Sequence, residues 1–111
     1  MARTVHRITV DKGERTIVLR ASGELDAYVA PELTAALDQA DAATRLIADL
    51  TAVSFMDSTA LGVVVRSVRD RDGRSAETRV VLPRGTARRI FEMTGLDRAL
   101  PVSPSVEEAL G

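Results

Sequence analysis

Apolar and polar residues alternate in two segments near the start of the chain, residues 4–11 and 15–22. In the first segment His6 shares a face with two aliphatic residues, and in the second segment three aliphatic residues share a face. This period of two is typical of β-strands that bury one side. The Lys-Gly-Glu sequence at 12–14 suits a tight turn between them. The pattern therefore predicts an N-terminal β-hairpin.

Apolar residues recur with helical spacing in two later segments, residues 31–40 and 58–71. A loop at 22–26 leads to Pro31, and proline is favoured in the first turn of a helix. In the second helix Arg66 and Arg69 lie off the apolar stripe, so we expect solvent around them. The apolar residues expected to be buried are Leu33, Ala36, Leu37 and Ala40 in the first helix, and Leu61, Val64, Val65 and Val68 in the second.

Two segments, 45–50 and 79–82, contain short apolar runs and read as buried strands, and a weaker strand is expected near 100–102. A third helix can be capped by Thr86 and ended by Gly95, because glycine after the last turn followed by an apolar residue is a common helix end. A short helix is expected to close the chain. The third helix groups the apolar residues Ala87, Ile90, Phe91 and Met93, and the last one Val106, Ala109 and Leu110.

The predicted element order is β-β-α-β-α-β-α-β-α. Strands that alternate with helices imply right-handed crossovers and a mostly parallel sheet, to which the hairpin adds an antiparallel pair. The 111 residues suit one domain, and no internal linker or repeat is visible, so we expect a single α/β domain over 1–111.

Composition excludes several classes of protein. The chain has no cysteine, which removes disulfides and thiolate chemistry. Fifteen basic against sixteen acidic residues, with only three aromatic side chains, argue against nucleic-acid binding. The longest runs without a charge, 58–65 and 99–106, are far shorter than the roughly 20 residues that span a bilayer. With no signal-peptide pattern at the N-terminus, we expect a cytoplasmic protein without a membrane partner.

A search for catalytic groups is mostly negative. His6 is the single histidine and, on a strand face with aliphatic neighbours, is read as structural or partly exposed. The phosphate-binding glycine motifs are absent, and no transition-metal cluster is possible with one histidine and no cysteine. Ser58 has no second histidine to serve as its base, so a hydrolase is improbable. We therefore expect no enzyme, no metal and no cofactor of the chain's own.

One segment, residues 53–62, follows a buried strand and opens a helix, where open α/β sheets place their ligands. Asp57, Ser58 and Thr59 are all helix-capping types, although one would suffice. Either Asp57 caps and the others merely tolerate the first turn, or a hydroxyl is exposed there for modification. Gly62 has two interpretations as well. We favour close packing of the helix on the sheet over a surface kept flat for a partner.

Three segments of the chain resemble those of a known protein family. Residues 55–62, Phe-Met-Asp-Ser-Thr-Ala-Leu-Gly, are similar to the signature of bacterial anti-sigma factor antagonists of the STAS domain superfamily. That signature reads Asp-Ser-Ser/Thr-Gly/Ala-Leu-Gly. The Gly-Glu-Leu-Asp sequence at 23–26 and residues 91–97 resemble two further family segments in order and spacing. The resemblance spans nearly the whole chain.

The resemblance implies a partner-switching cycle. The unphosphorylated protein would bind an anti-sigma factor that is a serine kinase, release the sigma factor, and be switched off by phosphorylation of Ser58. A serine/threonine phosphatase would reverse the switch, and ATP and Mg²⁺ would belong to the kinase. The partner-binding residues would be Gly23, Glu24, Asp26, Asp57, Ser58, Thr59 and Gly62. The alternative is a STAS subunit of a transport, lipid-trafficking or sensory assembly whose Ser58 is never phosphorylated.

Overall fold

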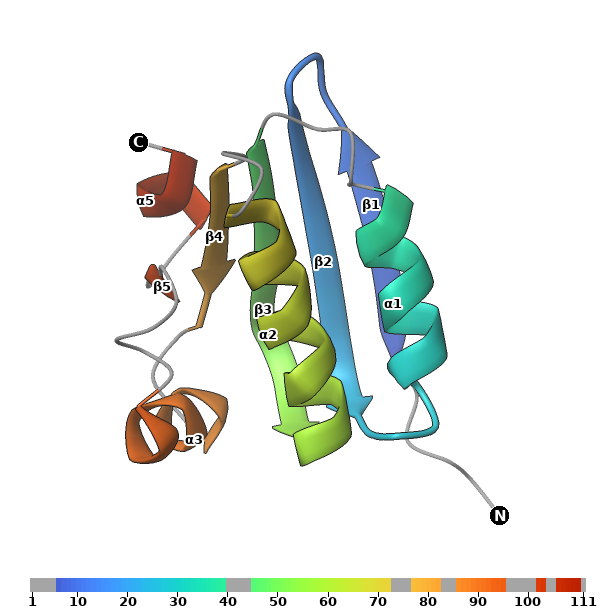
Figure 1. Cartoon of the computed structure of the whole chain (residues 1–111), viewed down its shortest axis with the longest axis vertical. Helices are drawn as coiled ribbons and strands as arrows, with labels where there is room; N and C mark the ends of the chain where they lie inside the picture. Colours follow the sequence, from blue (N-terminus) through green and yellow to red (C-terminus); the bar gives the residue numbers. More distant parts are fainter. Residues whose placement is uncertain are drawn as a thin grey trace.

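A five-stranded sheet forms the centre of the molecule, with its strands in chain order (Figure 1). The computed structural model describes residues 6–39, 45–72, 77–82, 86–95, 102–103 and 106–110. β1 pairs with β2 in antiparallel fashion and the other pairings are parallel, which confirms the predicted α/β fold class. The strands are β1 (Arg7–Lys12), β2 (Thr16–Leu25), β3 (Arg45–Met56), β4 (Glu77–Val81) and β5 (Val102–Ser103).

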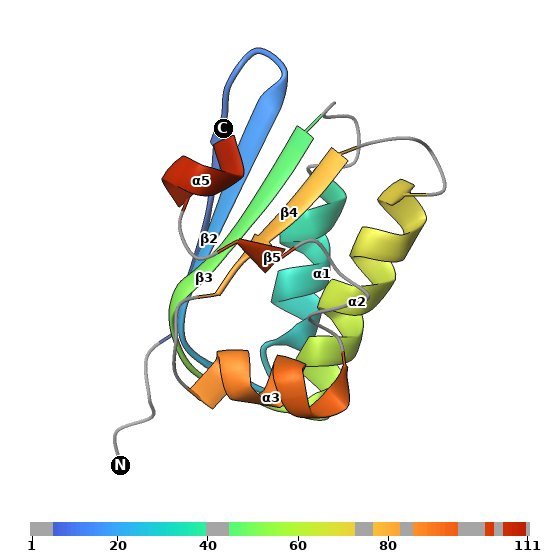
Figure 2. The ribbon, with the colours of Figure 1, turned by 90° about the vertical axis from the view of Figure 1, so that its left-hand side faces the viewer.

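The helices cover the two faces of the sheet unequally. α1 (Ala30–Gln39) and α2 (Ser58–Asp72) lie side by side on one face, and α5 (Val106–Leu110) lies on the other (Figure 2). α3 (Thr86–Thr94) lies beside the lower end of α2 in both views. Gly95 follows α3 with a φ of 77°, a left-handed conformation that glycine adopts freely, so the predicted helix-ending signal is confirmed.

Two strands, β2 and β3, extend further along the chain than predicted. β2 continues to Leu25 through the expected loop at 22–26, and β3 continues to Met56 through an expected connection. The two extensions pair with each other up to Leu25 and Met56, so each supplies the other's backbone hydrogen bonds. Register shifts break this pairing beside Gly23, whose φ of 83° is typical of glycine at a β-bulge.

Other differences at the ends of elements are small. The first strand begins at Arg7 and runs to Lys12, while residues 4 and 5 of the predicted strand lie outside the described residues. The same holds for Ala40 of the first helix and for residues 100–101 of the weak last strand. His6 stands partly exposed before β1, and its Nε2 lies 3.0 Å from a carboxylate oxygen of Glu32 on α1, as suits the structural interpretation.

The core lies mainly between the sheet and the pair α1 and α2. Its members include Leu19, Leu46, Leu50 and Phe91, all 1% exposed or less. A smaller cluster around Ile47 and Val81 lies under α5. Among the described residues, burial is incomplete at several of the apolar helix positions that the sequence singles out. Leu61 and Val65 on α2 are only partly buried, and Met93 on α3 is 80% exposed. Val64 and Val68 of α2 are buried as predicted, and Ala60 and Arg71 are buried as well.

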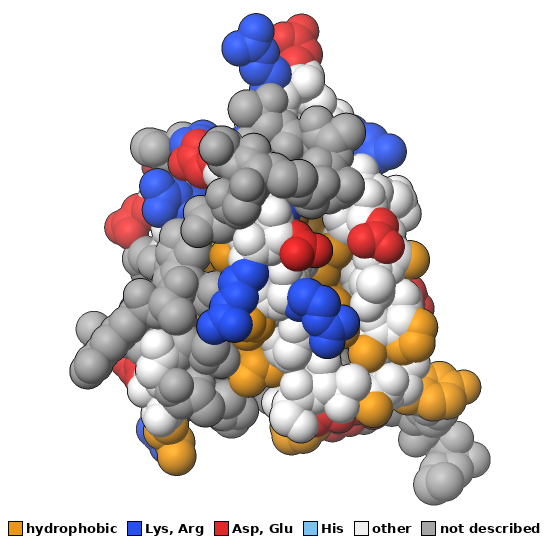
Figure 3. Space-filling view, viewed as in Figure 1, with side chains coloured by type: hydrophobic (Ala, Val, Ile, Leu, Met, Phe, Trp, Pro, Cys, Tyr) orange, Lys and Arg blue, Asp and Glu red, His pale blue; other side chains and the backbone are white. Residues whose placement is uncertain are grey.

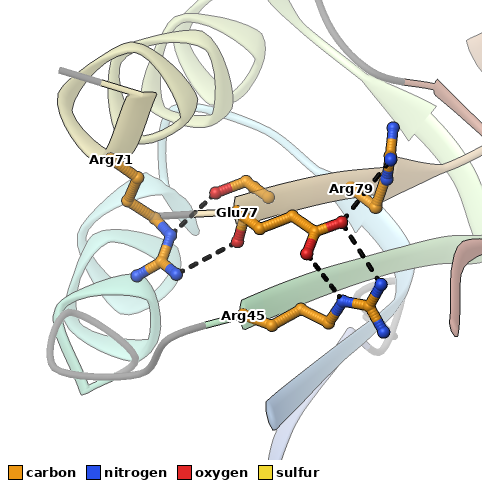
Figure 4. A network of polar contacts seen from close by, with 5 residues as sticks. Arg45, Arg71, Glu77 and Arg79 are labelled. Carbon is orange, nitrogen blue, oxygen red and sulfur yellow. Dashed lines mark hydrogen bonds and ion pairs between the residues drawn. The ribbon is translucent and has the colours of Figure 1, made fainter. Parts of the chain in front are cut away.

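Arg71 joins the end of α2 to the start of β4, although its side chain is only 1% exposed. Its Nε donates to Thr78 Oγ1 at 2.7 Å and its Nη2 to the carbonyl oxygen of Glu77 at 3.2 Å (Figure 4). A buried guanidinium needs such partners, since an unsatisfied charged donor is costly. Arg71 therefore fixes α2 against the sheet at the end opposite Ser58.

Glu77 lies between two arginines, Arg45 and Arg79, at the surface. Its contribution to the stability of the fold therefore depends on pH. The hydrogen bond from Arg45, whose Nε lies 3.1 Å from Glu77 Oε2, holds the pKa of this carboxyl below its ordinary value, and Arg79 acts in the same direction (Figure 4). A carboxylate with a lowered pKa stabilises the fold above its unfolded-state pKa and loses that contribution as the pH falls.

Glu77→Gln is expected to lower stability slightly at pH 7 and to have a smaller effect at roughly pH 3, because the stabilising contribution of a carboxylate with a lowered pKa declines as the pH falls below the unfolded-state pKa. Urea unfolding of both proteins at the two pH values measures this. Glu92→Gln is the control, because Glu92 is also exposed but has no cationic partner in the described part of the chain. An equal loss for Glu77→Gln at both pH values would contradict the electrostatic explanation.

Candidate functional site

Two helices begin at the same edge of the sheet, where β2 and β3 end side by side (Figure 1). The chain leaves β2 at Leu25 toward α1 and leaves β3 at Met56 toward α2. The backbone N–H of Asp57 donates to the carbonyl oxygen of Leu25 at 3.0 Å, so the two exits are tied together. Positions 23–26 and 57–59, far apart in sequence, therefore share one surface.

Asp57 caps α2 and also holds the loop that precedes α1. Its Oδ1 accepts the backbone N–H of Ala60 at 2.9 Å, the bond expected of a helix-capping aspartate. Its Oδ2 accepts the backbone N–H of Ala27 at 2.8 Å. Both carboxylate oxygens are thus used within the chain, so Asp57 is the cap of α2 and this side chain has a structural role.

Asp26 plays the corresponding part for α1. Its Oδ1 accepts the backbone N–H groups of Tyr28 at 3.0 Å and Val29 at 3.2 Å. Its carbonyl oxygen accepts the N–H of Ala30 at 3.0 Å, the first residue of the helix. Both aspartates that the sequence singled out therefore order a helix N-terminus, and Asp57 also links the two termini through Ala27.

Ser58 and Thr59 are the first two residues of α2, and both side chains are exposed. The cap does not occupy their hydroxyl groups, since Asp57 bonds backbone groups. A helix N-terminus has a partial positive charge and favours a phosphate placed in its first turn. The site thus offers a hydroxyl that can be reached from outside, on a rigid helix end suited to negative charge.

Gly62 contradicts the packing interpretation. A Cβ atom built on it would meet no atom within 4 Å, so the helix does not need glycine there to approach the sheet. Gly62 instead lies in an open groove of about 540 Å³, with Ser58 at one end. The other described residues that line this groove are Leu61, Val65, Arg66, Arg69 and Asp70.

Gly23 and Glu24, the two remaining predicted partner-binding residues, lie at the same edge of the sheet. Gly23 has its φ of 83° beside a register shift between β2 and β3, a backbone role that explains glycine there without a partner. Glu24 is exposed and lies opposite Phe55 of β3 in the register. The structure thus brings Gly23, Glu24 and Asp26 next to Asp57, Ser58 and Thr59, with Gly62 one turn along α2.

The described residues contain no group of three or more histidine, aspartate and glutamate side chains that could hold a metal ion. Within the same residues, no helix is both long and apolar enough to cross a membrane. At this edge the structure presents an exposed hydroxyl, a helix N-terminus and an open groove.

Comparison with known proteins agrees with this arrangement. The sequence pattern of the STAS domain matches residues 7–109, nearly the whole chain. The chain belongs to the STAS domain family. An anti-sigma-B factor antagonist of Listeria monocytogenes is 39% identical to it over 83 residues, which cover 73% of each chain.

Two solved structures extend the likeness to three dimensions. An anti-sigma factor antagonist from Mycobacterium paratuberculosis superposes with a TM-score of 0.86 at 30% identity, covering 96% of this STAS domain and 92% of that chain. The Bacillus cell fate determinant SpoIIAA in its phosphorylated form superposes with a TM-score of 0.73 at 28% identity, covering 94% and 96% of the two chains. The predicted family is thereby confirmed.

Large side chains with apolar surface are exposed on this STAS domain, and two of them, Tyr28 and Phe55, lie within two residues of Asp26 and Asp57. Tyr28 is 73% exposed just before α1, Phe55 is 45% exposed near the end of β3, and Met93 is exposed on α3. The sequence could have indicated that Tyr28 is exposed, because this residue lies in the turn between Asp26 and Pro31, outside any apolar periodicity. Exposed aromatic residues around a polar centre are typical of protein–protein interfaces.

Proposed function

We propose that this STAS domain is an anti-sigma factor antagonist that binds a serine-kinase anti-sigma factor when Ser58 is unmodified. Binding would release the sigma factor, and phosphorylation of Ser58 by the kinase, with ATP and Mg²⁺ held by the kinase, would end the complex. A serine/threonine phosphatase would restore the binding form. The observation that carries the proposal is the exposed Ser58 at the capped N-terminus of α2, within the family's signature sequence.

The geometry supports a switch that leaves the fold intact. A phosphate on Ser58 adds a charge of about −1.5 to −2 at pH 7. The helix N-terminus stabilises such a charge by about 0.3–2 kcal/mol, so α2 would keep its structure. A partner packed against the same surface would have to bury an unpaired dianion, which costs several kcal/mol. Phosphorylation would thus act on the complex rather than on the domain.

Similar proteins support the same function. The relative from Listeria monocytogenes and the structure from Mycobacterium paratuberculosis both have the name of anti-sigma factor antagonists. SpoIIAA is known in a phosphorylated form. Transfer of these properties to this chain remains our proposal, and the residues proposed for partner binding are Gly23, Glu24, Asp26, Asp57, Ser58, Thr59 and Gly62.

Ser58→Glu is expected to weaken binding to the purified anti-sigma kinase at least about tenfold, or about 1.4 kcal/mol, because a fixed charge must be desolvated at the interface. Isothermal titration calorimetry with the kinase in ADP measures this. Thr9→Glu is the matched control, since it adds the same charge at an exposed position on β1. Equal affinities for both variants, together with co-purification with a membrane transporter, would favour the non-phosphorylated transport subunit instead.

A further inference from the structure

An apolar groove runs along α2 away from Ser58. Leu61 and Gly62 each lie three or four residues from Ser58 and from Val65, and Arg69 lies four residues beyond Val65. These residues therefore form one stripe along the helix. The stripe is about 16 Å long, since a helix rises about 1.5 Å per residue. Figure 3 shows hydrophobic side chains exposed beside two basic side chains over α2.

The apolar side chains of this stripe pack only partly against the core and keep part of their surface open to solvent. Leu61 and Val65 are only partly buried, and open space stands over Gly62. Valine and glycine are both poor helix formers, so an exposed part of a helix gains nothing in stability from them. Exposed apolar surface next to a binding site indicates an interaction surface.

The charges beside the groove indicate the chemistry of what covers it. Arg66 and Arg69 are both exposed, and neither forms an ion pair with any residue that the structure describes. Two guanidinium groups with no carboxylate partner among the described residues, at the rim of an apolar surface, favour a partner that combines apolar side chains with carboxylates. Asp70 lines the far end of the groove, next to Arg69, so the basic side chains along the groove end there.

We propose that the α2 groove receives an acidic amphipathic helix of the anti-sigma partner. Three turns of such a helix match the length of the stripe, and Gly62 lets its backbone approach α2 closely. The carboxylates of the partner helix would lie at Arg66 and Arg69. This inference rests on the proposed function and assigns to it a second contact region, about three helical turns long.

The arrangement also bears on how the switch works. Ser58 lies at one end of the groove, so a phosphate there would add about two negative charges beside a partner segment that is itself acidic. Like charges within about 8–10 Å repel at physiological ionic strength. Phosphorylation would therefore weaken the groove contact as well as the contact with Ser58 itself.

The test uses the full chain and the purified anti-sigma kinase in ADP. The double variant Arg66→Glu and Arg69→Glu is expected to bind at least tenfold more weakly, and its affinity should depend less on salt. The control, Arg7→Glu with Lys12→Glu, makes the same change of charge at exposed positions on β1 and should bind within twofold of wild type. Equal weakening in both double variants would overturn the proposal, because it would reflect net charge alone.

Two substitutions at Gly62 separate the groove from the fold. Gly62→Ala and Gly62→Gln both meet open space and replace glycine with better helix formers, so both should raise the melting temperature. Gly62→Gln should nevertheless bind at least tenfold more weakly, because its side chain fills the groove, and Gly62→Ala should fall between it and wild type. Wild-type affinity for Gly62→Gln would overturn the proposal.

A photo-crosslinking residue at position 65 identifies the occupant. Crosslinking to an amphipathic partner segment with several carboxylates is the expected result, and crosslinking to a segment without them would overturn the acidic-helix assignment. Ser58→Glu separates a failure of the groove proposal from a failure of the proposed function. If Ser58→Glu abolishes binding while every groove variant binds normally, the groove proposal is wrong and the proposed function stands; if the wild-type chain does not bind the kinase, the proposed function itself is wrong.

Discussion

Phe91→Ala is expected to lower the free energy of unfolding by about 3–5 kcal/mol, the usual cost of removing a buried aromatic side chain. Phe91 is 1% exposed and belongs to the main core cluster, although it comes from α3 at the end of the sheet. Deleting its ring would leave a cavity where α3 meets the rest of the core. The measurement is urea unfolding followed by circular dichroism.

Met93→Ala is the matched control, because Met93 is on the same helix and is 80% exposed. It should change stability by no more than about 0.5 kcal/mol. Phe91→Leu, which keeps much of the apolar volume, should fall between the two. Similar losses for Phe91→Ala and Met93→Ala would mean that α3 is not anchored through Phe91.

Asp57→Ala is expected to destabilise the domain by about 2 kcal/mol. Loss of a helix cap typically costs about 1 kcal/mol, and loss of a second hydrogen bond costs about another. The two bonds are those to the N–H groups of Ala60 and Ala27, and they order the start of α2 and the loop before α1. Asp57→Ala should therefore also weaken partner binding, since it loosens the surface around Ser58.

Two further variants show whether both bonds matter. Asp57→Asn keeps one side-chain oxygen as an acceptor, so it should recover about half of the lost stability. Asp38→Ala removes an exposed aspartate near the end of α1, where the helix dipole disfavours negative charge, and should be neutral or slightly stabilising. Equal losses for Asp57→Ala and Asp38→Ala would contradict the role assigned to the cap.

The element order could be predicted from the sequence because it depends on local periodicity. Alternation at 4–11 and 15–22 and the helical spacing after Pro31 each reflect one buried face. The extension of β2 to Leu25 could not be found in this way, because its partners are residues of β3 some thirty positions later. The same distance hides the bond from Ala27 to Asp57, which is what turns a helix cap into a link between two helices.

The sequence also could not show how wide the buried stripe on α2 is. Spacing shows that Leu61, Val64 and Val65 share one side of the helix, but the neighbouring elements decide how much of that side they cover. The structure covers Val64 and leaves Leu61 and Val65 partly open. Gly62 was misjudged for the same reason, because a glycine that faces a sheet and one that faces solvent have the same sequence context.

The central claim, that Ser58 is the residue on which the switch acts, is tested most directly by intact-mass and peptide mass spectrometry after incubation with the purified anti-sigma kinase, ATP and Mg²⁺. The account predicts one added phosphate on the wild-type chain, located at Ser58, and none on Ser58→Ala. Thr59→Ala should still be phosphorylated, since Ser58 remains the first residue of α2. Phosphorylation of Ser58→Ala to the wild-type extent would contradict the account.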